Sequence, residues 1–340
     1  MIYIVAPGNH VTGGPETLHQ AANLISSMGY PVQMYYTDPH TTDVPERYQS
    51  YGTKTAAQIE DSASNLLIVP EAHTWILGDY RKIRKCIWWL SVDNYKIPDL
   101  KTSAGTLLQK YHLPKVLLPV AELWKVAAGK YHRYYYHFED NGEIFHAYNC
   151  EYARKFIIEN GIREDRMLYL CGPLNGTFFE TAKKLSGRPR ENIILYNPKK
   201  GKLFTQKIIA AAKERGIAAM FVPLKGMTPN QIAEYMSRAR VYMDFGTFPG
   251  PERIPREAVT MGCNIITSQN GAAANEIDVP IPEQLKFADR EDNIPCILDV
   301  LQDMLNNYDG YYHNYDAYRK KVLEQVVSFR DNMKLLVERA

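Results

Sequence analysis

The sequence predicts an α/β protein of two domains, each built on a parallel sheet. With 340 residues, the chain is longer than one ordinary hydrophobic core accommodates. In both halves, short apolar segments typical of buried parallel strands alternate with segments of helical periodicity. The net charge of +2 does not call for a nucleic-acid partner. No apolar stretch reaches the length that a membrane span requires.

The first elements predict a Rossmann-like βαβ unit. A strand at residues 2–6 is followed by a glycine-rich turn, a helix at residues 15–28 and a strand at residues 31–36. The dinucleotide fingerprint G-x-G-x-x-G is absent. Gly13 and Gly14 would let a ligand approach the backbone at the start of the helix. An ordinary tight turn is the alternative.

Polar residues follow the strands expected in the rest of this half, at residues 65–70, 85–92 and 144–148. His10 follows the first strand, and Asp93 follows the strand at residues 85–92. Because ligands gather beyond the carboxyl ends of parallel strands, both are candidates for acceptor binding or proton transfer. Glu71 and His73 are placed similarly. Each such group, taken alone, is more often a hydrogen-bonded polar residue or a cap than a catalytic residue. Residues 81–133 combine basic and aromatic side chains, which suits either anionic lipid headgroups or a solvated face.

A second series of strands and helices follows a linker expected at residues 171–176. The strand at residues 193–196 leads into Asn-Pro-Lys-Lys-Gly and then a helix, so that Lys199 and Lys200 could neutralise a diphosphate. A plain surface turn is the alternative. Thr228 begins a capping box, with proline at the first position of the helix. A long terminal helix is expected within residues 311–340.

The stretch at residues 241–267 predicts a strand, a glycine-proline loop, a helix starting near Arg253, and another strand. Glu252, Arg253, Arg256 and Glu257 surround the start of the helix. Two arginines at a helix amino terminus favour an anion, and a carboxylate beside them suits the hydroxyls of a ribose. These are the requirements of a nucleoside diphosphate. Alternatively, the same charges form i, i+4 pairs on a solvated helix face.

Taken together, these motifs resemble the GT-B glycosyltransferases, and most closely the retaining bacterial polysaccharide transferases of the E-x7-E type. The resemblance covers nearly the whole chain and rests on four segments: residues 13–16 (Gly-Gly-Pro-Glu), 171–179 (CGPLNGTFF), 197–201 (NPKKG) and 257–263 (EAVTMGC). It implies two Rossmann-like domains with parallel sheets facing across a cleft. Residues 1–170 would bind the acceptor, residues 171–310 would bind the nucleotide sugar, and residues 311–340 would form a helix packing back toward the first domain.

The resemblance also implies a function. The chain would transfer a hexosyl or related sugar from a nucleotide-activated donor to a saccharide or lipid-linked acceptor, in surface polysaccharide synthesis. The protein would be located in the cytoplasm. Contact with the inner face of the membrane is a further expectation. Lys199 or Lys200, with Arg253, would bind the diphosphate, and Glu257 would hold the ribose. No Asp-x-Asp loop is present, so neither a metal ion nor any cofactor besides the donor is expected. A sugar-nucleotide epimerase and a non-catalytic nucleotide-binding domain stay open as alternatives.

Three residues are candidates for a catalytic role. An inverting transferase needs a base for the acceptor hydroxyl, for which His10 is the first candidate and Asp93 the second. A retaining enzyme needs no such base. Pro249 stands where the family has the first glutamate of its motif. Glu252 is the nearest carboxylate and is the third candidate, although it lies out of register.

Overall fold

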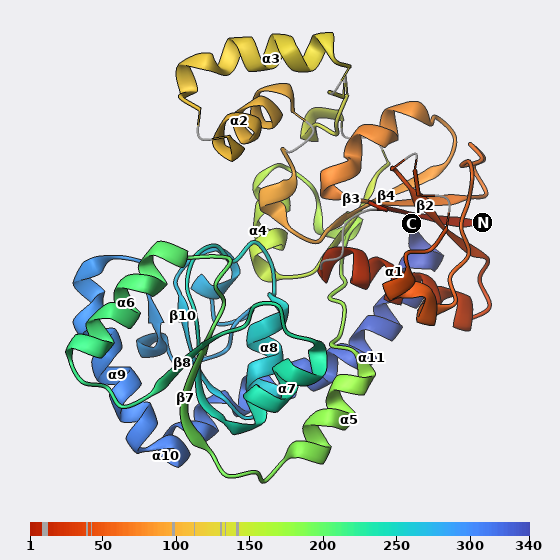
Figure 1. Cartoon of the computed structure of the whole chain (residues 1–340). Helices are drawn as coiled ribbons and strands as arrows, with labels where there is room; N and C mark the ends of the chain where they lie inside the picture. The colour runs from red at the N-terminus through yellow and green to blue at the C-terminus, as the bar shows by residue number, and fades with distance from the viewer. Residues whose placement is uncertain are drawn as a thin grey trace. The chain divides into compact units, whose positions relative to one another are not determined.

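The chain forms two compact units, each an α/β layer structure with an all-parallel sheet (Figure 1). A computed structural model describes the chain apart from residues 9–12, 39, 42, 97–98, 112, 130, 133 and 141–142, and apart from the side chains of residues 140 and 177. Unit 1 comprises residues 1–149, 153–172 and 329–340, and unit 2 comprises residues 150–152 and 173–328. The expectation of an α/β fold with two parallel sheets is confirmed.

Unit 1 contains a six-stranded sheet in the order β2-β1-β3-β4-β5-β6. Every neighbouring pair is parallel. The strands are β1 (Ile2–Ala6), β2 (Val32–Tyr36), β3 (Leu66–Pro70), β4 (Arg84–Trp89), β5 (Phe145–Tyr148) and β6 (Met167–Tyr169). The helices are α1 (Gly13–Ser27), α2 (Leu100–Lys110), α3 (Leu118–Ala127) and α4 (Glu151–Glu159).

The core of unit 1 is completed by the far end of the chain. Helix α11 (Asp316–Arg339) begins in unit 2, and its last turns belong to unit 1. Phe329, Met333 and Leu336 of this helix are buried in the same hydrophobic cluster as β1 and α1. The ring of Trp88 on β4 stacks on Phe329, with 6.1 Å between the ring centroids. Packing of these large apolar side chains therefore fixes the end of α11 to the unit 1 sheet.

Unit 2 contains a five-stranded sheet in the order β11-β10-β9-β7-β8. Helices α6 and α9 lie on one face and α7 and α8 on the other (Figure 1). The strands are β7 (Glu191–Tyr196), β8 (Met220–Pro223), β9 (Ala239–Asp244), β10 (Asn264–Ser268) and β11 (Lys286–Phe287). The helices are α5 (Gly176–Leu185), α6 (Lys202–Glu214), α7 (Pro229–Arg238), α8 (Arg253–Thr260), α9 (Ile294–Asn306) and α10 (Tyr308–Tyr312).

Several local expectations are confirmed and others are corrected. The capping box at Thr228 is present, with both reciprocal hydrogen bonds. The strand expected at residues 85–92 ends at Trp89, because Val92–Asn94 forms a 3₁₀ turn (η3). The terminal helix α11 spans Asp316–Arg339, inside the expected range, and follows α10 and a short 3₁₀ turn. No helix among the described residues is long and apolar enough to cross a bilayer.

Both sheets have a crossover point, where successive connections leave in opposite directions. In unit 1 this point lies between β1 and β3, and in unit 2 it lies between β7 and β9. The loops at the carboxyl ends of the two strands diverge there and leave room for a ligand. The residues that follow β7 and β9 are therefore the first place to look for a site in unit 2.

Candidate active site at the carboxyl ends of β7 and β9

Two glycines let the loops after β7 and β9 touch through their backbones. Gly201 has φ +58° and Gly246 has φ +103°, conformations that favour glycine. A Cβ atom on Gly201 would lie 2.4 Å from the carbonyl carbon of Phe245. A Cβ atom on Gly246 would lie 2.5 Å from the backbone nitrogen of Gly201. Glycine at both positions is therefore what brings Lys200, at the end of one loop, to Asp244, at the start of the other.

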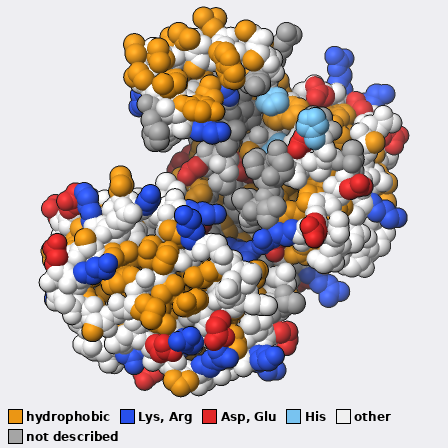
Figure 2. All heavy atoms as spheres, in the orientation of Figure 1, with side chains coloured by type: hydrophobic (Ala, Val, Ile, Leu, Met, Phe, Trp, Pro, Cys, Tyr) orange, Lys and Arg blue, Asp and Glu red, His pale blue; other side chains and the backbone are white. Residues whose placement is uncertain are grey.

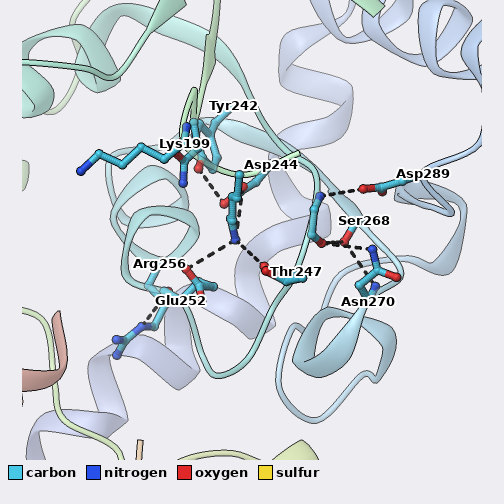
Figure 3. Close-up of polar contacts among 12 residues, drawn as sticks. Lys199, Tyr242, Asp244, Thr247, Glu252, Arg256, Ser268, Asn270 and Asp289 are labelled. Atoms are coloured by element: carbon cyan, nitrogen blue, oxygen red, sulfur yellow. Dashed lines mark hydrogen bonds and ion pairs between the residues drawn. The ribbon is translucent and has the colours of Figure 1, made fainter. Parts of the chain in front are cut away.

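Lys200 is the centre of the resulting cluster, whose members Asp244, Thr247 and Glu252 are shown in Figure 3. Its Nζ lies 3.3 Å from Asp244 Oδ1 and 3.4 Å from Glu252 Oε2. It also donates a hydrogen bond of 3.2 Å to the carbonyl oxygen of Thr247 and lies 3.5 Å from the centroid of the Phe248 ring. The side chain is only 15% exposed. The two carboxylates, the carbonyl and the ring together hold one ammonium group in a defined position.

Asp244 ends β9 and is buried, with 1% of its surface exposed. The hydroxyl of Tyr242 donates a hydrogen bond of 2.7 Å to Asp244 Oδ2. Burial raises the pKa of Asp244 to about 6, although the charge of Lys200 and the Tyr242 hydrogen bond both lower it. Burial next to this carboxylate also raises the pKa of Tyr242 well above its usual range. The carboxyl group thus gains and loses its proton close to neutral pH.

Residues at or just after the ends of β10 and β11 hold the loop after β9 in place. Ser268 at the end of β10 donates a hydrogen bond of 2.7 Å from its Oγ to the Gly246 carbonyl, and Asn270 Nδ2 donates one of 3.1 Å. The backbone N–H of Gly246 donates to Asp289 Oδ2 at 2.7 Å (Figure 3). The loop after β9 is therefore tied by hydrogen bonds to groups near the ends of β10 and β11, accepting two of them and donating the third, which makes it a preorganised element.

Helix α8 carries the second part of the site. Arg253 Nε donates to Glu257 Oε1 at 2.5 Å, and the Glu257 residue is only 4% exposed. Arg256 is 8% exposed and donates to the backbone carbonyl of Glu252 at 3.2 Å and to Gln325 Oε1 of α11 at 2.9 Å. The interpretation of these charges as a solvated helix face therefore does not hold for Arg256 and Glu257, although the i, i+4 pair of Arg253 with Glu257 is present. Charged groups this deeply buried are held by partners, as is usual for functional or structural ion pairs.

The structure separates the two lysines of the loop after β7. Lys200 contacts Asp244 and Glu252 of the cluster. The side chain of Lys199 extends away from the cluster (Figure 3) and is exposed. Only the backbone N–H of Lys199 is tied to the loop, through a hydrogen bond of 3.0 Å to Asn197 Oδ1. Of the predicted residues, the structure thus brings Lys200 and Glu252 into one cluster and joins Arg253 to Glu257 at the start of the adjoining helix.

Of the candidate site residues in unit 1, the structure describes Gly13, Gly14 and Asp93 but not His10. Gly13 and Gly14 begin α1, after the strand β1 that borders the crossover. A Cβ atom added at Gly13 would meet no described atom within 4 Å, and one at Gly14 would meet only Leu90 Cδ1, at 3.8 Å. Asp93 is exposed in η3, beyond the end of β4. His10 lies outside the described residues, so its predicted role stays a prediction.

Glu71 is the buried titratable group at the crossover of unit 1. It follows β3 directly, is 2% exposed, and its Oε2 accepts a hydrogen bond of 2.8 Å from the backbone N–H of Leu90, just after β4. Burial raises its pKa to about 7, against the opposing effect of the backbone hydrogen bonds that it accepts. A carboxyl group that exchanges its proton at neutral pH is thus built into the end of this sheet.

Sequence reasoning missed Asp244, Tyr242 and Asp289. The sequence pattern indicates only a buried strand at Asp244, because four of the five residues of VYMDF are apolar or aromatic. A single acid at the carboxyl end of a buried strand, followed directly by Phe-Gly, is the signal that could have identified it. Nothing local in the sequence indicates that Asp289, which follows β11, reaches the loop after β9.

Comparison with known proteins identifies the fold. No protein-family model and no curated protein matches the sequence. A glycosyltransferase from Rickettsia africae is 12% identical, with 99% of this chain and 98% of that chain covered and a TM-score of 0.63. A sucrose-phosphate synthase from Thermosynechococcus elongatus is 12% identical over the same shares of the two chains, with a TM-score of 0.60. HepE from Anabaena, solved with UDP and glucose, is 10% identical over 100% and 99% of the chains, with a TM-score of 0.55.

These matches extend over essentially the full length of each chain. Together with the two all-parallel sheets, they define the class: this protein has the GT-B fold, as the sequence motifs predicted. Within that fold, the candidate site of this chain consists of the cluster around Lys200 and the Arg253–Glu257 pair.

Proposed function

We propose that the protein is a glycosyltransferase that moves a hexosyl or related sugar from a nucleoside-diphosphate sugar to a saccharide or lipid-linked acceptor. We further propose that it acts in surface polysaccharide synthesis, in the cytoplasm and at the inner face of the membrane. The observation that carries the proposal is the Lys200 cluster, because it stands at the crossover of the unit 2 sheet, where ligands of this type of fold bind. HepE, which shares the fold, was solved with UDP and glucose.

The leaving diphosphate would be bound by cations and by helix amino termini. Lys200 and Arg253 each precede or begin a helix, α6 and α8 respectively, so their charges add to the free N–H groups of those helices. In the transition state the diphosphate gains negative charge, which groups already fixed in position stabilise most effectively. These groups would serve without a metal ion. Lys199, exposed beside them, would contribute a more distant charge.

The carboxylates have distinct proposed roles. Glu257, held by Arg253, would accept hydrogen bonds from the ribose hydroxyls. Glu252 lies beside Lys200, is 27% exposed along its side chain, and would contact the reacting sugar. Asp244 is buried behind Lys200 and would position the ammonium group rather than touch the donor. In this scheme the negative charges of the cluster keep Lys200 in place until the phosphate oxygens arrive.

Acceptor binding is assigned to unit 1. Among the described residues, Gly13 has no neighbour within 4 Å of an added Cβ and Gly14 has only Leu90 Cδ1, which supports a binding site at the amino terminus of α1. If the reaction inverts the configuration of the sugar, a base must take the acceptor proton, and we propose His10 for this step, with Asp93 as the second candidate. If the reaction retains configuration, these two side chains would only bind the acceptor.

Ligand-induced thermal stabilisation tests the donor site. The wild-type protein is heated with UDP, GDP, ADP, CMP or dTDP and with the corresponding nucleotide sugars, alongside Lys200→Ala and the control Lys213→Ala. Lys213 is an exposed lysine in the last turn of α6, so its loss leaves the cluster intact. We expect one nucleoside diphosphate to raise the melting temperature of the wild type and of Lys213→Ala. In Lys200→Ala this stabilisation should disappear, because the central cation is lost.

Release of the nucleotide from the nucleotide sugar, with and without saccharide acceptors, tests the reaction. We expect Lys200→Ala to reduce turnover by about a hundredfold or more, since it removes a charge that stabilises the leaving group. Incubation with the donor alone is the control for conversion of the donor without transfer. Equal nucleotide stabilisation and turnover in Lys200→Ala and the wild type would refute the assignment of the site.

A further inference from the structure

Helices α2 and α3 form a hairpin in unit 1 with a very small core of its own. Its buried apolar residues are Ala104, Leu108 and Ala121, with Leu107 and Leu118 packed against them at partial burial. All of these lie on the faces that α2 and α3 turn toward each other. Two of the three buried side chains are single methyl groups, so the hairpin encloses little apolar surface.

The outer side of the hairpin exposes much larger apolar side chains. Val116, Val120 and Leu123 are 80%, 62% and 70% exposed. They are separated by four and three residues, so they share one face of the helical segment that includes α3. We call this face and its flanking residues the α3 surface; the flanking exposed residues are Tyr111, Leu113, Leu117, Trp124 and Val126. In Figure 2 the orange of hydrophobic atoms gathers over α2 and α3.

Such a patch differs from the scattered apolar residues of an ordinary surface. Soluble proteins expose single apolar side chains freely, but contiguous patches of this kind mark contact sites. Most of the large exposed apolar residues between 99 and 129 belong to the single helix α3 or to the turn before it. What normally covers this surface must therefore supply an extended apolar environment.

The charges around the α3 surface select among possible partners. Residues 99–129 contain four lysines (Lys101, Lys110, Lys115 and Lys125) and only two acids (Asp99 and Glu122). Lys110 and Lys115 are exposed beside the apolar row, whereas Glu122 is partly buried. Asp99 is engaged as the cap of α2, where it accepts the N–H of Thr102 at 2.8 Å. Exposed lysines thus lie on the hairpin that carries these apolar residues, and one of its two acids is used as a helix cap.

We propose that the α3 surface binds an anionic lipid bilayer, with α3 lying in the interface and its apolar row buried among the acyl chains. Exposed lysines then lie at the level of the phosphate groups, and Trp124 and Tyr111 suit the same boundary layer. A second copy of the chain is a poorer fit, because pairing two α3 surfaces would bring like charges together. This inference rests on the proposed action at the inner face of the membrane, but its evidence is the hairpin, so vesicle binding can fail while turnover of the nucleotide sugar does not.

Co-sedimentation with vesicles tests the proposal. The full-length protein is mixed with vesicles of phosphatidylglycerol and phosphatidylcholine, or of phosphatidylcholine alone. We expect binding to the anionic vesicles, and a loss of about tenfold or more in the partition coefficient for the triple variant Val116→Ser, Val120→Ser, Leu123→Ser. Lys110→Gln and Lys115→Gln should each weaken binding by about fivefold at low salt, because each lysine contributes electrostatic attraction.

Matched controls separate this effect from general loss of apolar surface. The variant Leu203→Ser, Leu323→Ser, Val327→Ser removes three residues that are 75%, 56% and 63% exposed on α6 and α11, and it should bind as the wild type does. Circular dichroism and the melting temperature establish that both triple variants are folded. Failure of the wild type to bind anionic vesicles would overturn the proposal. So would unchanged binding by the α3 variant, or a dimer in sedimentation velocity that only this variant dissolves.

Discussion

The crossovers of unit 2 and unit 1 share a topology, but the loops and side chains that surround them differ. In unit 2 two glycines allow the backbones of the loops after β7 and β9 to contact each other. Lys200 is surrounded there by two acids, a backbone carbonyl and an aromatic ring. In unit 1 no described atom lies within 4 Å of a Cβ placed on Gly13 at the start of α1, and β3 is followed directly by a buried carboxyl group, Glu71. One crossover is therefore a fixed arrangement of charges, and the other presents backbone and space.

The difference indicates how one sheet topology serves two kinds of ligand. The diphosphate of a nucleotide sugar carries a fixed negative charge, so a preorganised cluster binds it with little rearrangement. An acceptor saccharide is neutral and varied, and an open helix start can receive it without fixed charges. Each prediction below alters one crossover in a way that should leave the other unchanged.

The largest effect is expected from closing the glycine contact. In Gly201→Ala, the new Cβ atom would overlap the backbone at Phe245, and alanine disfavours φ +58°. We expect a loss of about 3 kcal/mol or more in the stability of unit 2, because backbone atoms on both sides must move. The matched variant is Gly13→Ala, where the added methyl meets no described atom and stability should change by less than about 0.5 kcal/mol. Calorimetric melting compares the two variants, and equal losses would contradict the contrast.

The next effect is a pH dependence that originates in unit 1. The pKa of Glu71 is about 7 in the folded state, against an ordinary value of 4.5. Between these values the folded protein holds the proton and the unfolded chain releases it, so stability falls as pH rises from 4.5 to 7, by up to about 3 kcal/mol. Glu71→Gln, which keeps a carbonyl acceptor for Leu90, should remove this part of the dependence. Melting temperatures of both proteins at pH 5 and pH 8 measure it; parallel changes would refute it.

A smaller effect concerns the ribose. If Glu257 accepts hydrogen bonds from the ribose hydroxyls, 2′,3′-dideoxy nucleotides should bind the wild type about tenfold more weakly than the ordinary nucleotide. Glu257→Gln should bind the ordinary nucleotide more weakly and should discriminate between the two ligands less. Calorimetric titration of both proteins with both nucleotides gives the coupling energy. Full discrimination by Glu257→Gln would place the ribose elsewhere.

The smallest predicted effect is proton uptake at Asp244. A phosphate bound to Lys200 adds negative charge near Asp244, whose pKa is already about 6, and so should raise that pKa further. Affinity for a nucleotide sugar, which does not itself titrate in this range, should therefore rise about threefold from pH 7.5 to pH 6. Asp244→Asn should bind with the same affinity at both pH values. An equal pH dependence in the variant would assign it to another group.

Local signals in the sequence were enough to predict most of the fold. The apolar run at residues 2–6 and the Thr228 capping box each specify structure through near neighbours, and both are confirmed. Burial of Arg256 could not be predicted in the same way. Its partner Gln325 lies 69 positions along the chain, on α11, so the i, i+4 spacing of charges indicated a solvated face instead.

The candidate site was predicted only in part, because some of its residues are marked by local signals and others depend on long-range contacts. Lys200 and Arg253 were recognised because they stand at predicted helix starts, where sequence position alone suggests anion binding, and Glu257 was recognised through the family resemblance of residues 257–263. The acids that hold Lys200 depend on the contact between Gly201 and Gly246, which follows from strand order. Whether β9 pairs with β7 or lies elsewhere in the sheet is decided by packing of the whole unit, and no short motif encodes it.

The passage of α11 from one unit into the other has a consequence for how the chain is made. The cluster that contains β1 and α1 also contains Phe329, Met333 and Leu336, and Arg84 hydrogen-bonds the backbone carbonyl of Ala340. On the ribosome, the amino-terminal sheet therefore emerges first but lacks part of its interior until residues 329–340 have been translated. Until then its unfilled apolar surface is exposed, which is the period in which a chaperone would be needed most.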